Sequence, residues 1–247
     1  MIIQSGKPLR VRARLLFAAL IYLGSQGAAL AGVFSVTPVR IYMTPKDRAV
    51  AVTLNNDGDG SVVLQADIYA WTQDADGTDH MTPSEDLLLS PPIIKLAPKA
   101  RQVVRLAMLA PRDPARQMTY RMILREVPEA VQPREKIEVP IALALNMPIF
   151  VTPPQAKREV RCEISRTEAQ GLQAVCANTG SAYAQIRELS LKRGDEELAT
   201  FQGGTYILSG ARKTFQFKTP KHASPGEAQL SVTFDDFQTQ TSVVALP

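Results

Sequence analysis

IEVPIALALNMPIF, residues 137–150, is a long stretch of alternating apolar residues. Because a β-strand places successive side chains on opposite faces, one face of this strand would carry six large apolar side chains. These six are Ile137, Val139, Ile141, Leu143, Leu145 and Met147. Strands usually span about five or six residues, and proline within a sheet is found at edges, strand starts or bulges, so Pro140 predicts an edge strand. The strand therefore presents more apolar surface than its own small domain needs to cover.

The rest of the chain has the same all-β pattern. Short alternating runs separated by turn signals occupy the first half, and they recur after the hydrophilic, proline-containing segment VTPPQAKRE, residues 151–159. Such spacing predicts β-sandwiches, and the sequence shows no repeat and no long amphipathic helix. We expect an all-β protein of two Ig-like sandwich domains, at about residues 32–151 and 152–247. The runs expected as strands are FSVTPVRIYM, AVAVTLNN, SVVLQADIYAWTQ, QVVRLAML, TYRMILREVP, VRCEIS, LQAVCAN, AYAQIRELSLKR, KTFQFKT, AQLSVTF and TSVVAL.

Residues 1–31 have the three-part layout of a secretory signal peptide. Arg10, Arg12 and Arg14 precede the apolar run LLFAALIYL, and small residues follow up to Ala31, after which we expect cleavage. The alternative is a membrane anchor, but residues 24–27 interrupt the apolar run, which falls short of the roughly 20 residues that a span requires. The sequence therefore predicts an exported protein without stable membrane insertion.

The charge of the mature chain differs from that of the full sequence. The 247 residues include 28 Lys and Arg and 24 Asp and Glu, for a formal net charge of +4. The leader contains four basic residues and no acid, so its removal leaves equal numbers of basic and acidic residues. Without a basic excess, a role in nucleic-acid or membrane-surface binding has no compositional support.

The two cysteines, Cys162 and Cys176, lie in the strand-like runs VRCEI and QAVCA. A hairpin could bring them together, and we expect a disulfide, which suits an oxidising compartment. A reactive thiol pair or a metal site is the alternative. Neither is favoured, because the spacing is not CxxC and no histidine lies nearby.

The sequence carries no complete catalytic or metal-binding motif. Its two histidines, His80 and His222, lie in polar turns and belong to no nucleophile or zinc motif. The segment DADGTDHMTPSE, residues 74–85, partly matches a calcium loop, but Asp79 stands where the loop needs glycine. We expect a solvated turn there, and we expect Trp71 to be a core anchor rather than a sugar-stacking platform. We therefore expect no enzymatic activity, no cofactor and no metal.

Four segments, in order, resemble the first domain of PapD-like periplasmic chaperones of the chaperone-usher pilus pathway. They are SVTPVRIYM, SPPIIKLAPKARQVVRL, TYRMILREVP and the alternating strand. The likeness is strongest from Phe34 to Pro154 and weaker beyond. YAWTQ, LLLSPPI and YRMILREVP are most similar to the archaic or alternative branch. The resemblance implies two Ig-like domains set at an angle around a subunit-binding cleft.

The resemblance also implies what the apolar strand does. Such chaperones lend an edge strand to an incomplete pilus subunit, and this donor-strand complementation is a known form of β-augmentation. The six apolar side chains would fill the open groove of the subunit while the strand backbone pairs with its walls. The implied partners are pilus or fimbrial subunits and an outer-membrane usher, in the periplasm. Packing inside the strand's own domain is the alternative, and the free edge could also support self-association.

A basic clamp for the terminal carboxylate of the subunit is implied as well, because the register of the donated strand must be fixed. Arg40, in PVRIY, matches one position of the family clamp. Where many members have lysine on the donor strand, this chain has Pro148, and we expect Arg121 of TYRMIL to supply the second cation. Arg121 could instead be a solvent-facing strand residue. Arg125 is a weaker candidate, and Arg105 could equally be structural.

An exported Ig-like adhesive or structural surface protein is the competing function. A pilus subunit would show one domain with an N-terminal donor extension, whereas two domains are expected here directly after the leader. The sequence therefore favours the chaperone.

Overall fold

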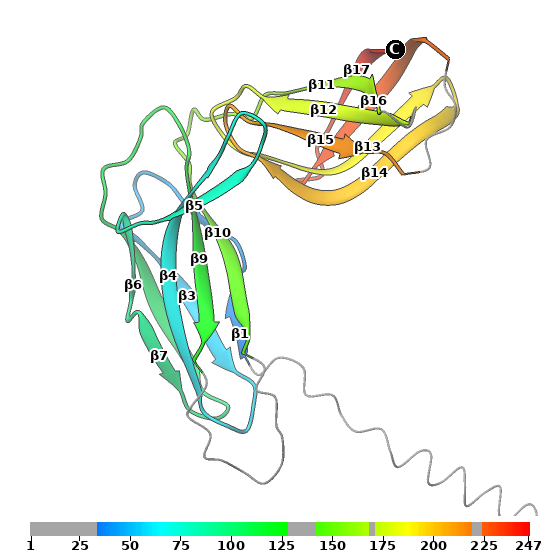
Figure 1. Ribbon diagram of the computed structural model, residues 1–247. Coiled ribbons are helices and arrows are strands. Elements are labelled where there is room, and N and C mark those ends of the chain that lie inside the picture. Colours follow the sequence, from blue (N-terminus) through cyan, green and yellow to red (C-terminus); the bar gives the residue numbers. More distant parts are fainter. Residues whose placement is uncertain (1–33, 128–141, 168–170, 219–223) are drawn as a thin grey trace, which may run out of the picture. The chain divides into compact units, whose positions relative to one another are not determined.

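The computed structural model describes residues 34–127, 142–167, 171–218 and 224–247, which contain strands and no helix (Figure 1). The all-β prediction is confirmed. Among these residues there is consequently no helix long and apolar enough to cross a membrane. The expected signal peptide lies outside the described residues, as do Ile137, Val139 and Ile141.

Strands from the first half of the chain form two sheets, which we call the first lobe. The four-stranded sheet has the order β1-β3-β8-β6, and the larger sheet has the order β2-β10-β9-β4-β5, with β7 also paired to β4. Alternate side chains are buried on both sheets, as in a sandwich, because each sheet turns one face to the core. The strands are β1 (Phe34–Thr37), β2 (Ile41–Met43), β3 (Ala49–Asn56), β4 (Val62–Gln73), β5 (Asp79–Pro83), β6 (Leu87–Ser90), β7 (Ile93–Leu96), β8 (Arg101–Met108), β9 (Met118–Glu126) and β10 (Ala144–Val151).

Strands from the second half form two further sheets, which we call the second lobe. Their orders are β11-β12-β15 and β14-β13-β16-β17. One apolar cluster, which includes Ile186, Leu191, Phe215 and Leu230, draws on both sheets and forms the core. The two expected sandwiches are therefore present. The strands are β11 (Val160–Arg166), β12 (Leu172–Asn178), β13 (Ala184–Arg193), β14 (Glu196–Ile207), β15 (Arg212–Gln216), β16 (Gly226–Phe234) and β17 (Thr239–Leu246).

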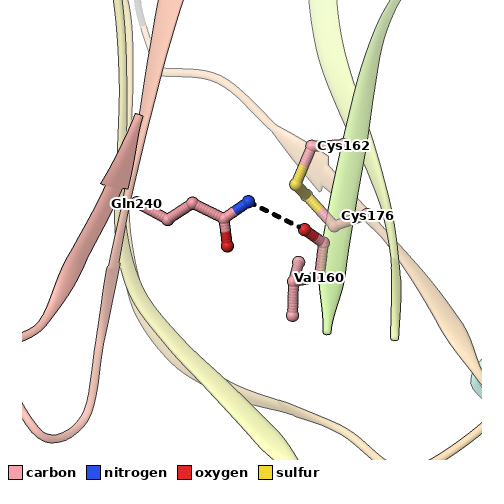
Figure 2. The surroundings of a disulfide bond; sticks show 4 residues. All are labelled: Val160, Cys162, Cys176 and Gln240. Atoms are coloured by element: carbon pink, nitrogen blue, oxygen red, sulfur yellow. Dashed lines mark hydrogen bonds between the residues drawn. A yellow bond between two sulfur atoms is a disulfide. The ribbon is translucent and has the colours of Figure 1, made fainter. Parts of the chain in front are cut away.

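A disulfide joins Cys162 of β11 to Cys176 of β12 (Figure 2). The two residues are directly opposite each other in the strand register, with Cα atoms 4.0 Å apart. Cys176 is fully buried, and Cys162 packs against the core from a partly buried position. Beside the bridge, Gln240 Nε2 of β17 donates a hydrogen bond of 3.1 Å to the Val160 carbonyl, so β17 is tied to β11 of the other sheet. The predicted disulfide is confirmed.

We expect the purified protein to contain no reactive thiol and to lose stability on reduction. The bridge links residues separated by 14 positions, and closing a loop of that size stabilises a fold by about 3 kcal/mol. Thiol titration in denaturant and urea unfolding with and without reductant measure both effects. A Cys162→Ser, Cys176→Ser double variant is the control, because it should match the reduced protein and ignore the reductant. Two reactive thiols per chain would contradict the prediction.

Candidate functional site

Strand β10 extends beyond the strand that covers one of its edges. β9 pairs with β10 from Ala144 to Val151, whereas β2 pairs only with Ile149–Val151. The Glu126 amide donates to the Leu143 carbonyl, and the Thr152 amide donates to the Met43 carbonyl of β2. Because backbone groups point alternately to the two sides of a strand, odd-numbered residues of β10 bond toward β9 and even-numbered ones face the β2 side.

The backbone of Ala144, Asn146 and Pro148 therefore forms an open edge, since no strand of the described residues pairs with β10 on that side before Ile149. Pro148 fits this position because its missing N–H falls on the side without a ladder partner. The expectation of an edge strand holds for this part of β10. It does not hold for Ile149–Val151, which lie between β9 and β2.

The apolar face of β10 passes from covered to exposed toward its start. Met147 is 3% exposed and lies opposite the fully buried Met122 of β9. The expectation that Met147 belongs to an uncovered face is therefore wrong, because its side chain is buried in the core of the first lobe. Leu145 is half-buried, and Leu143, just before β10, is 36% exposed. Leu143 and Leu145 remain candidates for contact with a partner.

Arg40 lies in the link between β1 and β2 and is held by polar groups of the second lobe. Its Nη1 is 2.5 Å from Asp235 Oδ2, and its Nη2 donates a 2.7 Å hydrogen bond to Gln185 Oε1. Nη1 also donates to the hydroxyl of Tyr42, and the hydroxyl of Tyr183 donates to Asp235 Oδ2 at 2.9 Å. The Arg40 side chain is 28% exposed and that of Asp235 is 13% exposed. Arg40 is thus already paired with a carboxylate of the same chain.

The protonation states in this group follow from its surroundings. Burial alone would lower the pKa of Arg40, but the hydrogen bond to Tyr42 and the neighbouring tyrosines raise it above its ordinary value. Burial raises the pKa of Tyr183, and the hydrogen bond with Tyr42 and the charge of Asp235 raise it further. The guanidinium therefore stays charged and the Tyr183 phenol stays neutral at physiological pH.

Arg121 lies on β9, directly across from Pro148 of β10 and Tyr69 of β4. Its guanidinium carbon is 3.7 Å from the ring centroid of Trp71 and 5.4 Å from that of Tyr206, so the cation stacks on aromatic rings. No carboxylate of the described residues forms an ion pair with it. Burial lowers the pKa of Arg121, although a guanidinium stays charged at neutral pH. Arg121 is therefore a partly buried cation that forms no ion pair in the described part of the chain, although the charge of Asp79 acts on it.

The structure brings the two expected clamp residues together. Arg40 and Arg121 approach the same aromatic ring, at 5.6 Å and 5.4 Å from the centroid of Tyr206. Arg125 is exposed and paired with Asp67. Arg105 is exposed on β8, in the other sheet of the lobe. Of the four arginines considered, only Arg40 and Arg121 share a site.

An aromatic cluster lies beneath the arginines. Trp71, Phe150 and Leu208 are buried together, and Tyr183 and Tyr206 pack against them. Trp71 is buried as predicted, in a cluster with Phe150 of the first lobe and Leu208 of the second. Its Nε1 donates a 2.8 Å hydrogen bond to Asp79, so the polar end of the indole is satisfied. The cluster therefore supports the site from both lobes.

The segment considered as a calcium loop contains a turn that contacts the second lobe. The Asp74 amide donates a hydrogen bond to the Thr78 carbonyl, and this bond closes the expected turn between β4 and β5. The Arg212 amide donates to the Ala75 carbonyl at 3.2 Å, and the Gln73 side chain bonds the backbone of the second lobe at two points. Within the described ranges, no three potential metal-ligating side chains gather. The segment serves as a structural contact between the lobes.

We expect Gly77→Ala to weaken this contact. Gly77 has a φ of +84°, and a Cβ there would lie 2.3 Å from the carbonyl oxygen of Arg212. Gly210→Ala is the matched control, because Gly210 has the same φ of +84° and a Cβ there would meet nothing within 4 Å. Gly77→Ala should cost roughly 1–3 kcal/mol more in urea unfolding than its control, since only it adds a steric clash to the backbone strain. Equal losses would contradict the contact.

Comparison with known proteins identifies the family. Residues 33–157 match the family described as "Pili and flagellar-assembly chaperone, PapD N-terminal domain". The chain belongs to this chaperone family. A search of curated proteins by sequence found no match for the chaperone.

Solved pilus chaperones share its fold. A chain of the CsuC–CsuE chaperone–tip subunit complex, from archaic Csu pili of Acinetobacter baumannii, matches with a TM-score of 0.64 and 17% identity, over 86% of the chaperone and 98% of that chain. The E. coli chaperone DraB gives 0.56 and 16%, over 87% and 95%. The Pseudomonas aeruginosa chaperone CupB2 gives 0.54 and 19%, over 86% and 100%. At these identities the likeness shows the fold alone, and it agrees with the two sandwiches.

Sequence reasoning missed the residues that surround Arg40. Asp235 lies 195 positions from Arg40 along the chain, and Tyr183 lies 143 positions away. Neither belongs to a local motif, and only the contact between the lobes brings them to the site. The tyrosines could have been noticed only as polar-tipped aromatics in the second half of the chain.

Proposed function

We propose that this chaperone binds incomplete Ig-like pilus or fimbrial subunits by lending them the edge of β10. The observation that carries the proposal is the open edge at Ala144, Asn146 and Pro148, next to the exposed Leu143. A subunit strand paired there would satisfy the free backbone groups, as in β-augmentation. Leu143 and Leu145 would then enter the interior of the subunit, together with the expected donor residues Ile137, Val139 and Ile141. Burying each large apolar side chain contributes about 1.5–3 kcal/mol.

Arg40 and Arg121 are proposed to anchor the terminal carboxylate of the subunit. The position of Arg121 directly across from Pro148 supports the idea that it replaces the lysine of other family members. Arginine binds carboxylates through strong, charge-assisted hydrogen bonds. Such an anchor would fix the register of the donated strand, because a slip of one residue would turn its apolar side chains away from the groove.

The remaining parts of the proposal follow from family membership. We propose that residues 1–31 are removed on export, that domains at about 32–151 and 152–247 act in the periplasm without enzymatic activity, and that an outer-membrane usher receives the subunits. The likeness of fold to a chain from the archaic Csu system supports assignment to the archaic or alternative branch. The competing role of an adhesive or structural surface protein has no comparable support.

Co-expression with a pilus subunit that lacks its last strand tests the proposal. The chaperone should retain this subunit as a soluble complex through affinity purification. The matched control is the same subunit with a donor strand fused to its own chain, which should not be retained because its groove is filled. Failure to retain the incomplete subunit, or equal retention of both forms, would overturn the proposal.

A further inference from the structure

We propose that Asp235 occupies Arg40 before capture, so that the terminal carboxylate of a subunit must displace Asp235 to reach both arginines. Asp235 would then weaken the binding of ligands that bring a carboxylate of their own and reduce the preference of the site for an acid over the matching amide. This inference rests on the proposed function, because it concerns the same carboxylate site.

The contacts of Arg40 show that its site is filled from within the chain. The carboxylate of Asp235 approaches Nη1 at 2.5 Å, while Gln185 accepts a hydrogen bond from Nη2. A guanidinium binds a carboxylate best through two parallel hydrogen bonds. Because Asp235 and Gln185 accept from different terminal nitrogens, an incoming carboxylate that bonds both of these nitrogens must displace both side chains. Asp235 carries the same charge as the incoming group, so it also repels that group.

The two arginines therefore differ before capture. Arg121 stacks on aromatic rings and forms no ion pair among the described residues, so a terminal carboxylate meets less competition there than at Arg40, although the charge of Asp79 also acts on Arg121. Arg40 has a negative charge beside it. A carboxylate that binds Arg121 first would lie near Tyr206, the ring that both arginines share, and from there it could compete for Arg40.

Asp235 can leave Arg40 without losing every partner. It directly follows β16, and its own amide donates to the Gln185 carbonyl, which fixes its backbone. Its Oδ2 also accepts a hydrogen bond from the Tyr183 hydroxyl at 2.9 Å. A small rotation of the side chain could keep the Tyr183 bond while releasing Arg40. The exchange of one carboxylate for another therefore leaves neither the cation nor the displaced carboxylate without a hydrogen bond.

Asp235→Asn tests the inference, because it keeps the shape of the side chain and removes its charge. The probes are synthetic peptides of the C-terminal segment of a captured subunit, made as the free acid and as the amide. The variant should bind the acid form about 3- to 10-fold more tightly than wild type, because the competing charge of Asp235 is removed. Its affinity for the amide form should equal that of wild type. Asp236→Asn is the matched control, because Asp236 is the adjacent carboxylate and pairs with Arg158 instead. Asp236→Asn should leave the affinities for the acid and the amide peptide within about twofold of wild type, because the ion pair that it removes lies outside the site.

A second measurement uses the wild-type protein and does not depend on the folding of a variant. The NMR signal of the Asp235 side-chain carboxyl carbon should move when the acid peptide is added and stay in place with the amide. An unchanged Asp235 signal, or unchanged acid affinity in Asp235→Asn, would overturn the inference if wild type still prefers the acid peptide. A wild-type protein without that preference would instead overturn the proposed clamp, and the inference with it.

Discussion

Leu143→Asp should abolish subunit capture while leaving the free chaperone within about 1 kcal/mol of wild-type stability, as for most exposed substitutions. Leu143 is 36% exposed and precedes the paired part of β10, so the folded chaperone does not depend on it for its core. In a complex the new carboxylate would enter an apolar groove without a partner, and we expect affinity to fall at least about 100-fold. Subunit retention and urea unfolding measure the two effects.

Two further variants serve as controls for Leu143→Asp. Leu109→Asp makes the same change at another exposed leucine of the first lobe, outside β10, and should retain capture. Met147→Asp places the charge in the core and should cost more than about 4 kcal/mol of stability, because a buried charge lacks a partner there. If Leu143→Asp destabilises the free chaperone as much as Met147→Asp does, Leu143 belongs to the chaperone's own core and the donor assignment fails.

Arg121→Ala should weaken subunit capture by roughly 2–3 kcal/mol, or about 30- to 150-fold, because the terminal carboxylate would lose a partly buried charged partner. Arg125→Ala, four residues along the same strand, is the matched control. Arg125 is exposed and already paired with Asp67, so its loss should change capture by less than about threefold. Affinity for the incomplete subunit, measured beside circular dichroism of each variant, separates lost binding from lost folding.

Arg121→Lys refines the test. It keeps the charge but loses the planar group that stacks on Trp71, so it should fall between wild type and Arg121→Ala. Wild-type capture by Arg121→Ala would remove Arg121 from the site and leave Pro148 without a substitute cation.

The strands that sequence reasoning found are those whose alternation reflects one buried and one exposed face. β9 and β12 show this alternation, and each was expected from its own residues. Two of the missed strands, β5 and β14, lack it. β14 contains Gly203 and Gly204, and every side chain of β5 is exposed, so neither shows a period of two. β6 and β7 do alternate between buried and exposed positions, but each is only four residues long, which is too short for a clear period of two in the sequence.

Part of the site could also be predicted. Resemblance to the family pointed to Arg40, and the search for a cation to replace the missing lysine pointed to Arg121, because both depend on local sequence in the first lobe. The burial of Met147 could not be read from alternation, since the same apolar face continues from a covered segment into an uncovered one. Asp235 was missed because an ion pair between distant segments leaves no local pattern.

Amide hydrogen exchange at Asn146, followed by NMR with and without a bound subunit, tests donor-strand complementation most directly. The Asn146 amide lies on the open edge of β10, whereas the neighbouring Leu145 amide faces β9 and serves as an internal control. We expect Asn146 to exchange quickly in the free chaperone and slowly in the complex, while Leu145 stays protected in both. An Asn146 amide that exchanges equally fast in the complex would show that no subunit strand pairs with this edge, and would contradict donor-strand complementation by β10.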